Sequence, residues 1–441
     1  MHALRSPGVR GITAHLLIVV SLAVWPGAAA AQGDTLRLTL SEARQRASAS
    51  NPDLAAAALD TAIAAGGLRQ ARVIPFNPSA DALPARKKLG GEYGLSQEVE
   101  IFGQRGLRIK VGTAGLERAR GGVMEGRRVT LGEVDRDFYR LVSASRRSDL
   151  ATEVRTLNER LSDIAGRQLI AGEISRLDYN LALIELGRSR SNAIAVGREQ
   201  KSVEIELGRL LGLPLTTRVV PVLDPGQHQP PAPGLADTTN DVRAIIEAAA
   251  LLNVDSLTSI ALRLRPDLAA RSATVRQTRS ELALARRGAL PNLVLRGVME
   301  SDDAGKRVIR PGVGITLPLF NRNQGEVQSR RAAATQTELQ LMAAMGRVRA
   351  EIITAVQAYR SAAAEVEIFE TTVLVPARQN RQLLETAYRE GKVGLPVLLL
   401  IRNQVFDAEL DYWKAWLAER EALAFLEEAT GRNVLQFPLI R

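Results

Sequence analysis

Few residues of this chain could perform catalysis or bind a metal ion. The sequence contains no cysteine, which excludes disulfides, thiol nucleophiles and cysteine-ligated zinc. Of its three histidines, His2 and His15 lie in a leader that we expect to be removed, and His228 lies in a proline-rich segment. The acidic pair Glu427 and Glu428 is expected on a polar helix face. These residue types argue against an enzyme, and we predict neither a cofactor nor a bound metal.

The composition favours long helices over a sheet-based core. The chain has 441 residues, of which 46% are hydrophobic but only 4% aromatic, so a core must be built mainly from Ala, Leu, Val and Ile. The net charge is +10, yet basic and acidic residues alternate along the chain, as at Arg155, Glu159 and Arg160. Such alternation is typical of solvated helix faces, so no nucleic-acid partner is expected.

The N-terminal segment has the pattern of a secretory signal peptide. Arg5 and Arg10 precede an apolar stretch over 16–25, which is followed by small residues. We expect cleavage near Ala31 and Gln32. The apolar stretch is far shorter than the ~20 residues of a spanning helix. No later stretch of that length is uninterruptedly apolar.

The rest of the chain repeats itself. Residues 51–56, Asn-Pro-Asp-Leu-Ala-Ala, recur at 265–270 with a single change. Gly172 and Gly212 correspond to Gly391 and Gly431 at one common spacing. After the signal peptide, 1–31, we therefore predict a first structural repeat over 32–213, a proline-rich linker over 214–253, a second repeat over 254–431 and a tail over 432–441.

Each repeat is expected to contain the same series of elements. We predict a helix over 39–72 and 254–289, a β-like region over 74–102 and 291–320, a very long helix over 103–168 and 322–389, and a last helix over 176–212 and 395–430.

The long helices show coiled-coil spacing. Apolar residues recur every three or four positions, for example at Leu131, Val134, Phe138 and Leu141. The second long helix keeps this spacing at Leu341, Met345, Val348, Ile352, Ala355, Tyr359, Ala362, Val366 and Phe369. A helix of roughly 66 residues would be about 100 Å long, which excludes one compact globule. We expect the glycines at 121, 122 and 132 to bend the first long helix.

The β-like regions alternate between apolar residues and small or polar ones. Val313, Ile315, Leu317 and Leu319 alternate with glycine, threonine and proline, and Gln97 interrupts a similar pattern that begins at Tyr93. A first strand over 76–86 is inferred only by symmetry. Period-two alternation over about ten residues is typical of membrane β-barrels, although ordinary hairpins packed on helices would also show it. Three charged residues fall on the small or polar face and are candidates to line a barrel lumen: Glu98, Glu100 and Arg296.

Four strands cannot close a barrel alone, because the known minimum is about eight. Several copies must therefore contribute four strands each. Two copies would give a barrel filled by side chains, and three would give one wide enough for an open bore.

These segments resemble the outer-membrane efflux protein (TolC) family. The resemblance covers essentially the whole exported chain and is carried by the runs 38–43, 51–54, 290–293, 317–325 and 387–391. The runs 320–325 and 97–105 are most similar to the branch that works with heavy-metal exporters of the RND type.

The resemblance implies a mainly α fold with a small β part. Internally duplicated coiled-coil helices would form an α-barrel, and four strands per protomer would contribute to a 12-stranded trimeric barrel in the outer membrane. The partners implied are two further copies of the chain, a periplasmic adaptor, an inner-membrane pump of the RND type and outer-membrane lipid. The channel would conduct substrates passively to the exterior.

The resemblance also assigns functional residues. Adaptor contacts carry over to the two helix-turn-helix tips, although the apolar members could simply pack the turns: Gly172, Ile174, Ser175, Leu177, Gly391, Val393 and Leu395. A latch that holds the periplasmic gate closed carries over to Asp178 and Tyr388. The lumen carboxylates of the family fall on Val397 and Leu400, which predicts an apolar constriction that gates by dewetting.

Two other functions remain open from the sequence. A type I secretion duct for polypeptides would share the architecture, and a periplasmic coiled-coil scaffold or chaperone would explain the helices without a membrane.

Overall fold

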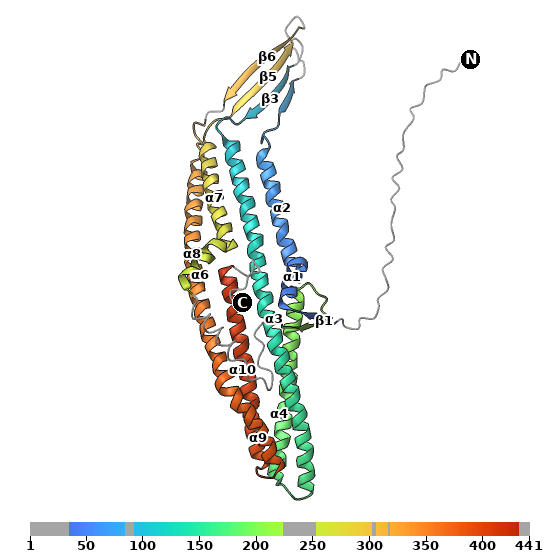
Figure 1. Cartoon of the computed structure of the whole chain (residues 1–441). Helices are drawn as coiled ribbons and strands as arrows, with labels where there is room; N and C mark the ends of the chain where they lie inside the picture. The colour runs from blue at the N-terminus through green and yellow to red at the C-terminus, as the bar shows by residue number, and fades with distance from the viewer. Residues whose placement is uncertain (1–34, 84–91, 224–252, 302–305, 316–317, 432–441) are drawn as a thin grey trace, which may run out of the picture.

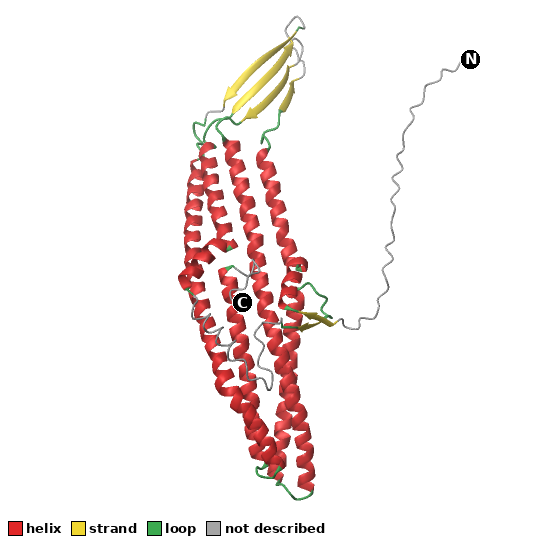
Figure 2. Ribbon diagram, viewed as in Figure 1, coloured by secondary structure: helices red, strands yellow, loops and turns green. Residues whose placement is uncertain are grey.

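The protein is elongated, with a small sheet at one end of a long bundle of helices (Figure 1, Figure 2). The computed structural model describes residues 35–83, 92–223, 253–301, 306–315 and 318–431. The predicted signal peptide, His228 and the tail over 432–441 lie outside the described residues. No described helix is both long enough and apolar enough to cross a membrane.

The first half of the chain follows the predicted order, with one short strand added at its beginning and one at its end. Its elements are β1 (Thr35–Leu38), α1 (Leu40–Ser50), α2 (Pro52–Arg72), β2 (Ser79–Leu83), β3 (Glu92–Val99), α3 (Gln104–Ile170), α4 (Arg176–Leu210) and β4 (Arg218–Pro221).

The second half repeats the series and ends on a helix. Its elements are α6 (Val254–Leu264), α7 (Pro266–Arg287), β5 (Leu293–Ser301), β6 (Arg307–Ile315), α8 (Gln324–Ile368), the π-helical turn η1 (Phe369–Val373), α9 (Leu374–Arg389) and α10 (Leu395–Thr430).

The first predicted helix of each repeat is wrong in one respect, because it is two helices. Pro52 and Pro266 each begin a new helix, since proline fits the first helical turn but disfavours helical geometry in the residue before it. The side chain of Asn51 caps α2 by accepting from the backbone N–H groups of Asp53 and Leu54 at 2.9 and 3.0 Å. Arg265 lies at the corresponding break between α6 and α7.

Equivalent residues serve equivalent purposes in the two halves. Asn51 donates to the backbone carbonyl of Leu210 near the end of α4, and Arg265 donates to that of Ala429 near the end of α10. The paired glycines at 172 and 391 and at 212 and 431 all have positive φ, between 65° and 74°. These correspondences support the proposal that the chain is an internal duplication.

Each strand of the sheet continues into a helix of the wall beneath it. The sheet is antiparallel in the order β2-β3-β5-β6. Below it, α3 packs against α2 and α7, and α7 packs against α8, so the helices follow the order of the strands (Figure 1). Towards the other end, α3 pairs with α4 and α9 pairs with α10. The predicted alternation runs to Leu319, but Leu319 lies in the connection to α8 and not in a strand. Residues 316 and 317 lie outside the described residues.

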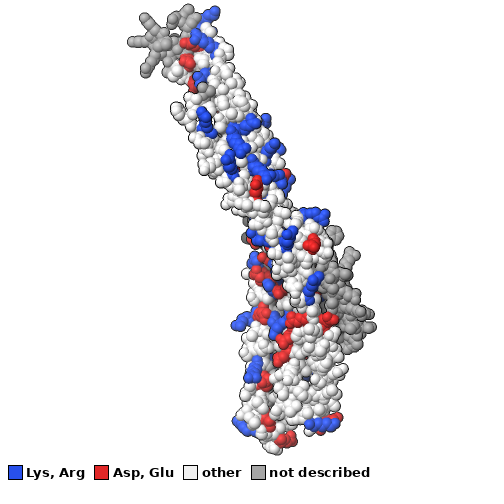
Figure 3. Space-filling model, turned by 90° about the vertical axis from the view of Figure 1, so that its left-hand side faces the viewer, with Lys and Arg blue, Asp and Glu red and all other residues white. Residues whose placement is uncertain are grey.

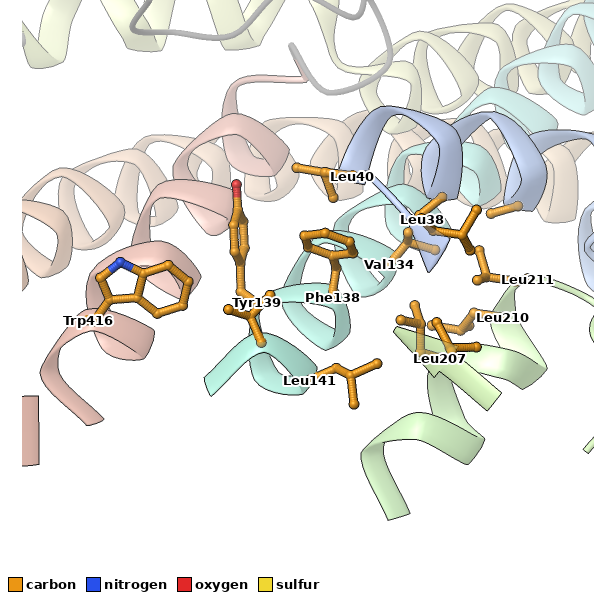
Figure 4. Packing of buried hydrophobic residues seen from close by; sticks show 14 of the residues in the cluster. Leu38, Leu40, Val134, Phe138, Tyr139, Leu141, Leu207, Leu210, Leu211 and Trp416 are labelled. Carbon is orange, nitrogen blue, oxygen red and sulfur yellow. The ribbon is translucent and has the colours of Figure 1, made fainter. Parts of the chain in front are cut away.

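The main core lies at the middle of the bundle, where the two repeats meet. Phe138 of α3 is fully buried among leucines of α1 and α4, and Trp416 of α10 is fully buried beside Tyr139 (Figure 4). The rings of Tyr139 and Trp416 meet edge-on, with centroids 5.9 Å apart. The heptad prediction is confirmed for most of α8, since Val348, Ile352 and their successors are buried, whereas Met345 is exposed.

A two-stranded parallel sheet beside this core was not predicted. β1 pairs with β4, so the first residues of the predicted linker belong to the folded body and pack Val219 into the core. The predicted linker over 214–253 contained no strand, because a strand of four residues gives almost no periodic signal.

The glycines of α3 do not interrupt it. The helix is continuous from Gln104 to Ile170. Gly121 marks a close approach to α7, since a side-chain carbon there would lie 2.9 Å from the backbone nitrogen of Ala270. The absence of a side chain therefore permits close helix packing, and the bends expected at 121, 122 and 132 stay a prediction.

Candidate functional site

The four-stranded sheet has two chemically different faces. Residues directly opposite each other in an antiparallel pair project from the same face, so the register assigns every side chain to one of the two. One face carries Ala80, Ala82, Tyr93, Leu95, Gln97, Val99, Leu293, Leu295, Gly297, Met299, Arg307, Ile309, Pro311, Val313 and Ile315. The other carries Ser79, Asp81, Leu83, Glu92, Gly94, Ser96, Glu98, Val294, Arg296, Val298, Glu300, Val308, Arg310, Gly312 and Gly314.

The apolar face is open to its surroundings. Val313 is 72% exposed, and Tyr93, Leu95 and Ile309 are also more than half exposed. Its polar members lie at the two ends of the sheet. Arg307 begins β6 at the end away from the helices, and Gln97 lies near the helices and donates to the backbone carbonyls of Phe76 and Glu98, each at 2.8 Å. An exposed apolar surface of this kind indicates a membrane or protein contact.

The sheet also has open edges. Within the described residues, β2 and β6 each pair with a strand on one side only. Unpaired strand edges are too costly in a hydrocarbon environment, where only a closed barrel satisfies every backbone group. A sheet of this size in a bilayer therefore needs strands from further copies.

The three predicted lumen residues lie at the polar side of the sheet. Register places Glu98 and Arg296 on the polar face. Glu98 accepts from the side-chain amide of Asn292 at 2.7 Å, and Gln104 donates to Asn292 at 3.2 Å. Glu100 follows the end of β3 and forms an ion pair with Arg108 of α3. The polar face thus continues onto the helices through hydrogen-bonded side chains, and a role in the lumen stays a prediction.

The two predicted tips meet at the end opposite the sheet. In each, a glycine with positive φ is followed by a reversed chain closed by backbone hydrogen bonds, Glu173 to Gln168 at 2.9 Å and Lys392 to Ala387 at 2.8 Å. One apolar cluster joins them and contains Leu161, Ala165, Ala182, Leu384, Leu395, Leu398 and Leu399.

The predicted adaptor-contact residues differ in exposure. Leu177 is 68% exposed and is available to a partner, whereas Leu395 is 5% exposed and packs inside the turn. Ile174 and Val393 are half-buried against the cluster that joins the tips. Ser175 caps α4, because its hydroxyl accepts from the backbone N–H of Asp178 at 3.1 Å.

The predicted latch residues have separate local contacts in the single protomer. Asp178 completes the cap of α4 by accepting from the hydroxyl of Ser175 at 2.8 Å. Tyr388 packs against the apolar cluster that joins the tips. Burial raises the pKa of the Tyr388 phenol, which keeps it protonated and able to donate. A hydrogen bond between the two residues stays a prediction.

The predicted constriction residues project away from the packed side of α10. Val397 is 43% and Leu400 61% exposed, whereas their neighbours Leu398 and Leu399 are buried. Because the two exposed residues are three apart, they lie on one helix face. An apolar ring could therefore form where copies of α10 approach each other.

Buried ion pairs that the sequence did not predict join the two repeats. Glu427 and Glu428 were expected on a polar helix face, and that prediction is wrong, because they are only 6% and 9% exposed. Arg44 binds Asp135 through two hydrogen bonds of 2.6 and 2.8 Å and also contacts Glu427 at 3.0 Å.

A second group of charges surrounds the neighbouring carboxylate. Glu428 pairs with Arg128 at 3.4 Å and also with Arg136. Gly132 leaves the space that this carboxylate occupies. Both groups fix the end of α10 to α3. Among the residues that the structure describes, no group of three or more acidic or histidine side chains is placed to hold a metal ion.

The second half of the chain matches a known protein family. Residues 257–432 match the family described as outer membrane efflux protein. The chain is 25% identical over 399 residues to the cobalt-zinc-cadmium resistance protein CzcC of Cupriavidus metallidurans, and the match covers 90% of each chain.

Solved structures share the fold along most of the chain. The CmeC outer membrane channel of Campylobacter jejuni matches with a TM-score of 0.72 and 16% identity over 89% of this chain and 85% of that one. CusC matches with a TM-score of 0.70 and 16% identity over 93% and 95%. The second repeat therefore matches the outer membrane efflux protein family, and the similarity to the relative and the shared fold extend across the first repeat.

Proposed function

We propose that three copies of this chain form an exit duct in the outer membrane. Three four-stranded sheets would supply twelve strands, enough for a barrel with an open bore. The apolar face would contact lipid and the polar face would line the bore. The observation that carries this proposal is a sheet with one exposed apolar face, one polar face and two unpaired edges, standing on a wall of helices.

The duct would be the outer part of a tripartite efflux system. A periplasmic adaptor would dock on the tips around Gly172 and Gly391, where Leu177 is exposed, and an inner-membrane pump of the RND type would load the duct. The similarity to a cobalt-zinc-cadmium resistance protein supports divalent metal cations as the substrate class, with drugs as the second class. The duct itself would catalyse no reaction.

The purified protein in planar bilayers tests this proposal. We expect stepwise ion conductance of uniform size from detergent-solubilised protein, because a closed barrel has one bore. A bilayer that stays silent, although the protein is folded and present in it, would reject the duct. A periplasmic scaffold would give that silent result, because it would have no bore. It would also leave the apolar sheet face without a role.

The periplasmic end is proposed to contain the gate. Exposed Val397 and Leu400 would form an apolar ring around the narrow end of the duct, and a hydrogen bond from Tyr388 to Asp178 would hold the helices close. Rings of apolar side chains resist the passage of ions because water leaves them readily.

Replacing Val397 with aspartate (Val397→Asp) tests the ring. Three carboxylates would keep the constriction hydrated, so we expect conductance to rise several-fold and cations to be favoured over anions. Ile194→Asp is the matched control, since Ile194 lies on α4 and is 73% exposed. Equal single-channel conductance of Val397→Asp, the control and the unaltered protein would contradict the assignment.

A further inference from the structure

The helix ends directly below the sheet carry far more basic than acidic side chains. Figure 3 shows lysine and arginine gathered over the helices in this region, with few acidic residues between them. The acidic residues there are already paired, Glu100 with Arg108 and both Glu281 and Glu326 with Arg330. The basic residues at this level come from the last turns of α2 and α7, the first turns of α3 and α8, and the segment just before α8. They are Arg69, Arg72, Arg105, Arg108, Lys110, Arg286, Arg287, Arg322, Arg330 and Arg331.

Contacts between helices show which face of α7 continues the polar face of the sheet. Arg108 of α3 pairs with Glu100 below that polar face, and Gly115 lies two turns further along the same side of α3. A side-chain carbon at Gly115 would lie 3.8 Å from the amide oxygen of Gln277 in α7. Gln277 in turn donates to Glu281 at 2.9 Å. This face of α7 therefore belongs to the side that would line the duct.

Four arginines lie on the opposite face of α7. Helical spacing places Arg276, Arg279, Arg286 and Arg287 together and away from Gln277. All four are exposed. Because the polar face of the sheet continues on the side of Gln277, these arginines continue the side of the apolar face.

Neighbouring helices extend the same basic surface. Arg276 pairs with Glu117 of α3 and Arg279 with Glu338 of α8, each at 2.7 Å. Lys110 and Arg331 lie two turns from these carboxylates, on the same helix sides and closer to the sheet. We call this surface the basic belt, and it consists of Lys110, Arg276, Arg279, Arg286, Arg287 and Arg331.

The part of the belt nearest the sheet has no carboxylate of its own. Within the described residues, Arg286 and Arg287 form no ion pair, and both are exposed. A role limited to the negative end of the α7 dipole would account for arginines in the last turn only. It would not account for Lys110 and Arg331, which lie in the first turns of α3 and α8.

Apolar side chains mark the boundary between sheet and belt. Phe320 is 92% exposed, Leu319 64% and Ile101 49%, and all three lie in the connections between strands and helices. Aromatic residues next to long basic side chains are typical of the boundary between hydrocarbon and headgroups. At 1.5 Å per residue, Arg279 lies only about 12 Å further from the sheet than Arg287, so most of the belt is within reach of a headgroup layer.

We propose that the basic belt binds the phosphate headgroups of anionic phospholipids in the leaflet on the helix side of the membrane. This inference rests on the proposed function, since it requires the sheet to lie in a bilayer. The belt would fix the depth of the barrel and surround it with anionic lipid, because a phosphodiester accepts hydrogen bonds from the arginine fork.

Spin-labelled lipids test the proposal in vesicles of phosphatidylcholine. The measurement is the fraction of labelled phosphatidylglycerol, and separately of labelled phosphatidylcholine, that is immobilised by the reconstituted protein. For the unaltered protein we expect phosphatidylglycerol to be preferred by about fivefold, the ratio for one arginine near an anionic surface. The preference should fall in 0.5 M salt, where the screening length is only about 4 Å.

The triple variant Arg286→Gln/Arg287→Gln/Arg331→Gln is expected to lose this preference. The control Arg160→Gln/Arg167→Gln/Arg198→Gln removes equal charge from exposed positions on the lower helices and should keep it. Equal immobilisation of both lipids by the unaltered protein, or equal loss in both variants, would overturn the belt.

Co-flotation with the vesicles separates the two proposals. Unaltered protein that floats with neutral vesicles but shows no lipid preference would refute the belt and leave the duct intact. Protein that does not float at all would refute the duct and the belt together. Because the salt effect is measured on the unaltered protein, the result does not depend on whether a variant folds.

Discussion

Replacing Val313 with arginine (Val313→Arg) is expected to prevent the protein from assembling in a bilayer. Val313 is 72% exposed on the apolar face of β6. An arginine on the lipid face of a barrel costs about 2–4 kcal/mol near the bilayer midplane. Three copies would raise this cost to about 6–12 kcal/mol per trimer, comparable to the whole stability of a folded domain. The measurement is the fraction of protein that forms heat-sensitive oligomers in vesicles.

The neighbouring residue provides the matched control. Gly314 lies on the polar face of the same strand. It pairs with Val294 of β5, and Val294 pairs with Glu98 of β3. Gly314→Arg should therefore assemble normally and shift the ion selectivity of the bore. If Val313→Arg and Gly314→Arg assemble equally well, or fail equally, the assignment of the two faces is wrong.

Removing the carboxylate of Asp135 (Asp135→Ala) should destabilise the helical body by about 3–5 kcal/mol. Asp135 is fully buried and binds Arg44 through two hydrogen bonds. Burial by itself lowers the pKa of Arg44, but pairing with Asp135 raises it by more. The pKa therefore lies above its ordinary value, and the guanidinium stays charged. The substitution would leave that charge buried with less compensation. Urea unfolding followed by circular dichroism measures the loss.

Two comparisons distinguish this effect from general disruption. Asp163→Ala, on an exposed position of the same helix, should change the free energy of unfolding by no more than about 0.5 kcal/mol. The paired replacement Arg44→Met/Asp135→Leu should recover most of the loss, because a buried ion pair can often be exchanged for apolar side chains. Asp135→Ala and Asp163→Ala unfolding alike would contradict a structural role for the pair.

Periodic patterns in the sequence predicted the elements that lie on the surface of the wall. The long helix beginning near residue 103 and the final helix of each repeat are confirmed to within a few residues. Alternation around Tyr93 and Val313 predicted strands correctly, because one face of each is mostly apolar. The turns at Gly172 and Gly391 are confirmed by their positive φ.

Contacts between distant segments could not be predicted from those patterns. Arg44 and Asp135 are separated by 91 positions, and a buried charge looks like any exposed one in a single sequence. The pairing of β1 with β4 joins the two ends of the first repeat through strands of only four residues. The presence of Pro52 and Pro266 could have revealed the breaks after Asn51 and Arg265, since proline disfavours helical geometry in the preceding residue.

The predicted functional residues show the same contrast between local patterns and contacts of distant segments. Register shows that Glu98 and Arg296 share a face, and exposure shows that Val397 and Leu400 are free to meet other copies. Leu395 was assigned to an adaptor contact but is buried, because the pattern of one tip does not reveal how the other packs against it.

The mass of the intact assembly shows whether three copies build the wall of the pore. Native mass spectrometry of the protein released from detergent should give three times the mass of one chain, and heating should convert this species to single chains without an intermediate pair. A sole species with the mass of one chain, able to conduct ions by itself, would show that the wall of the pore does not need strands from other copies.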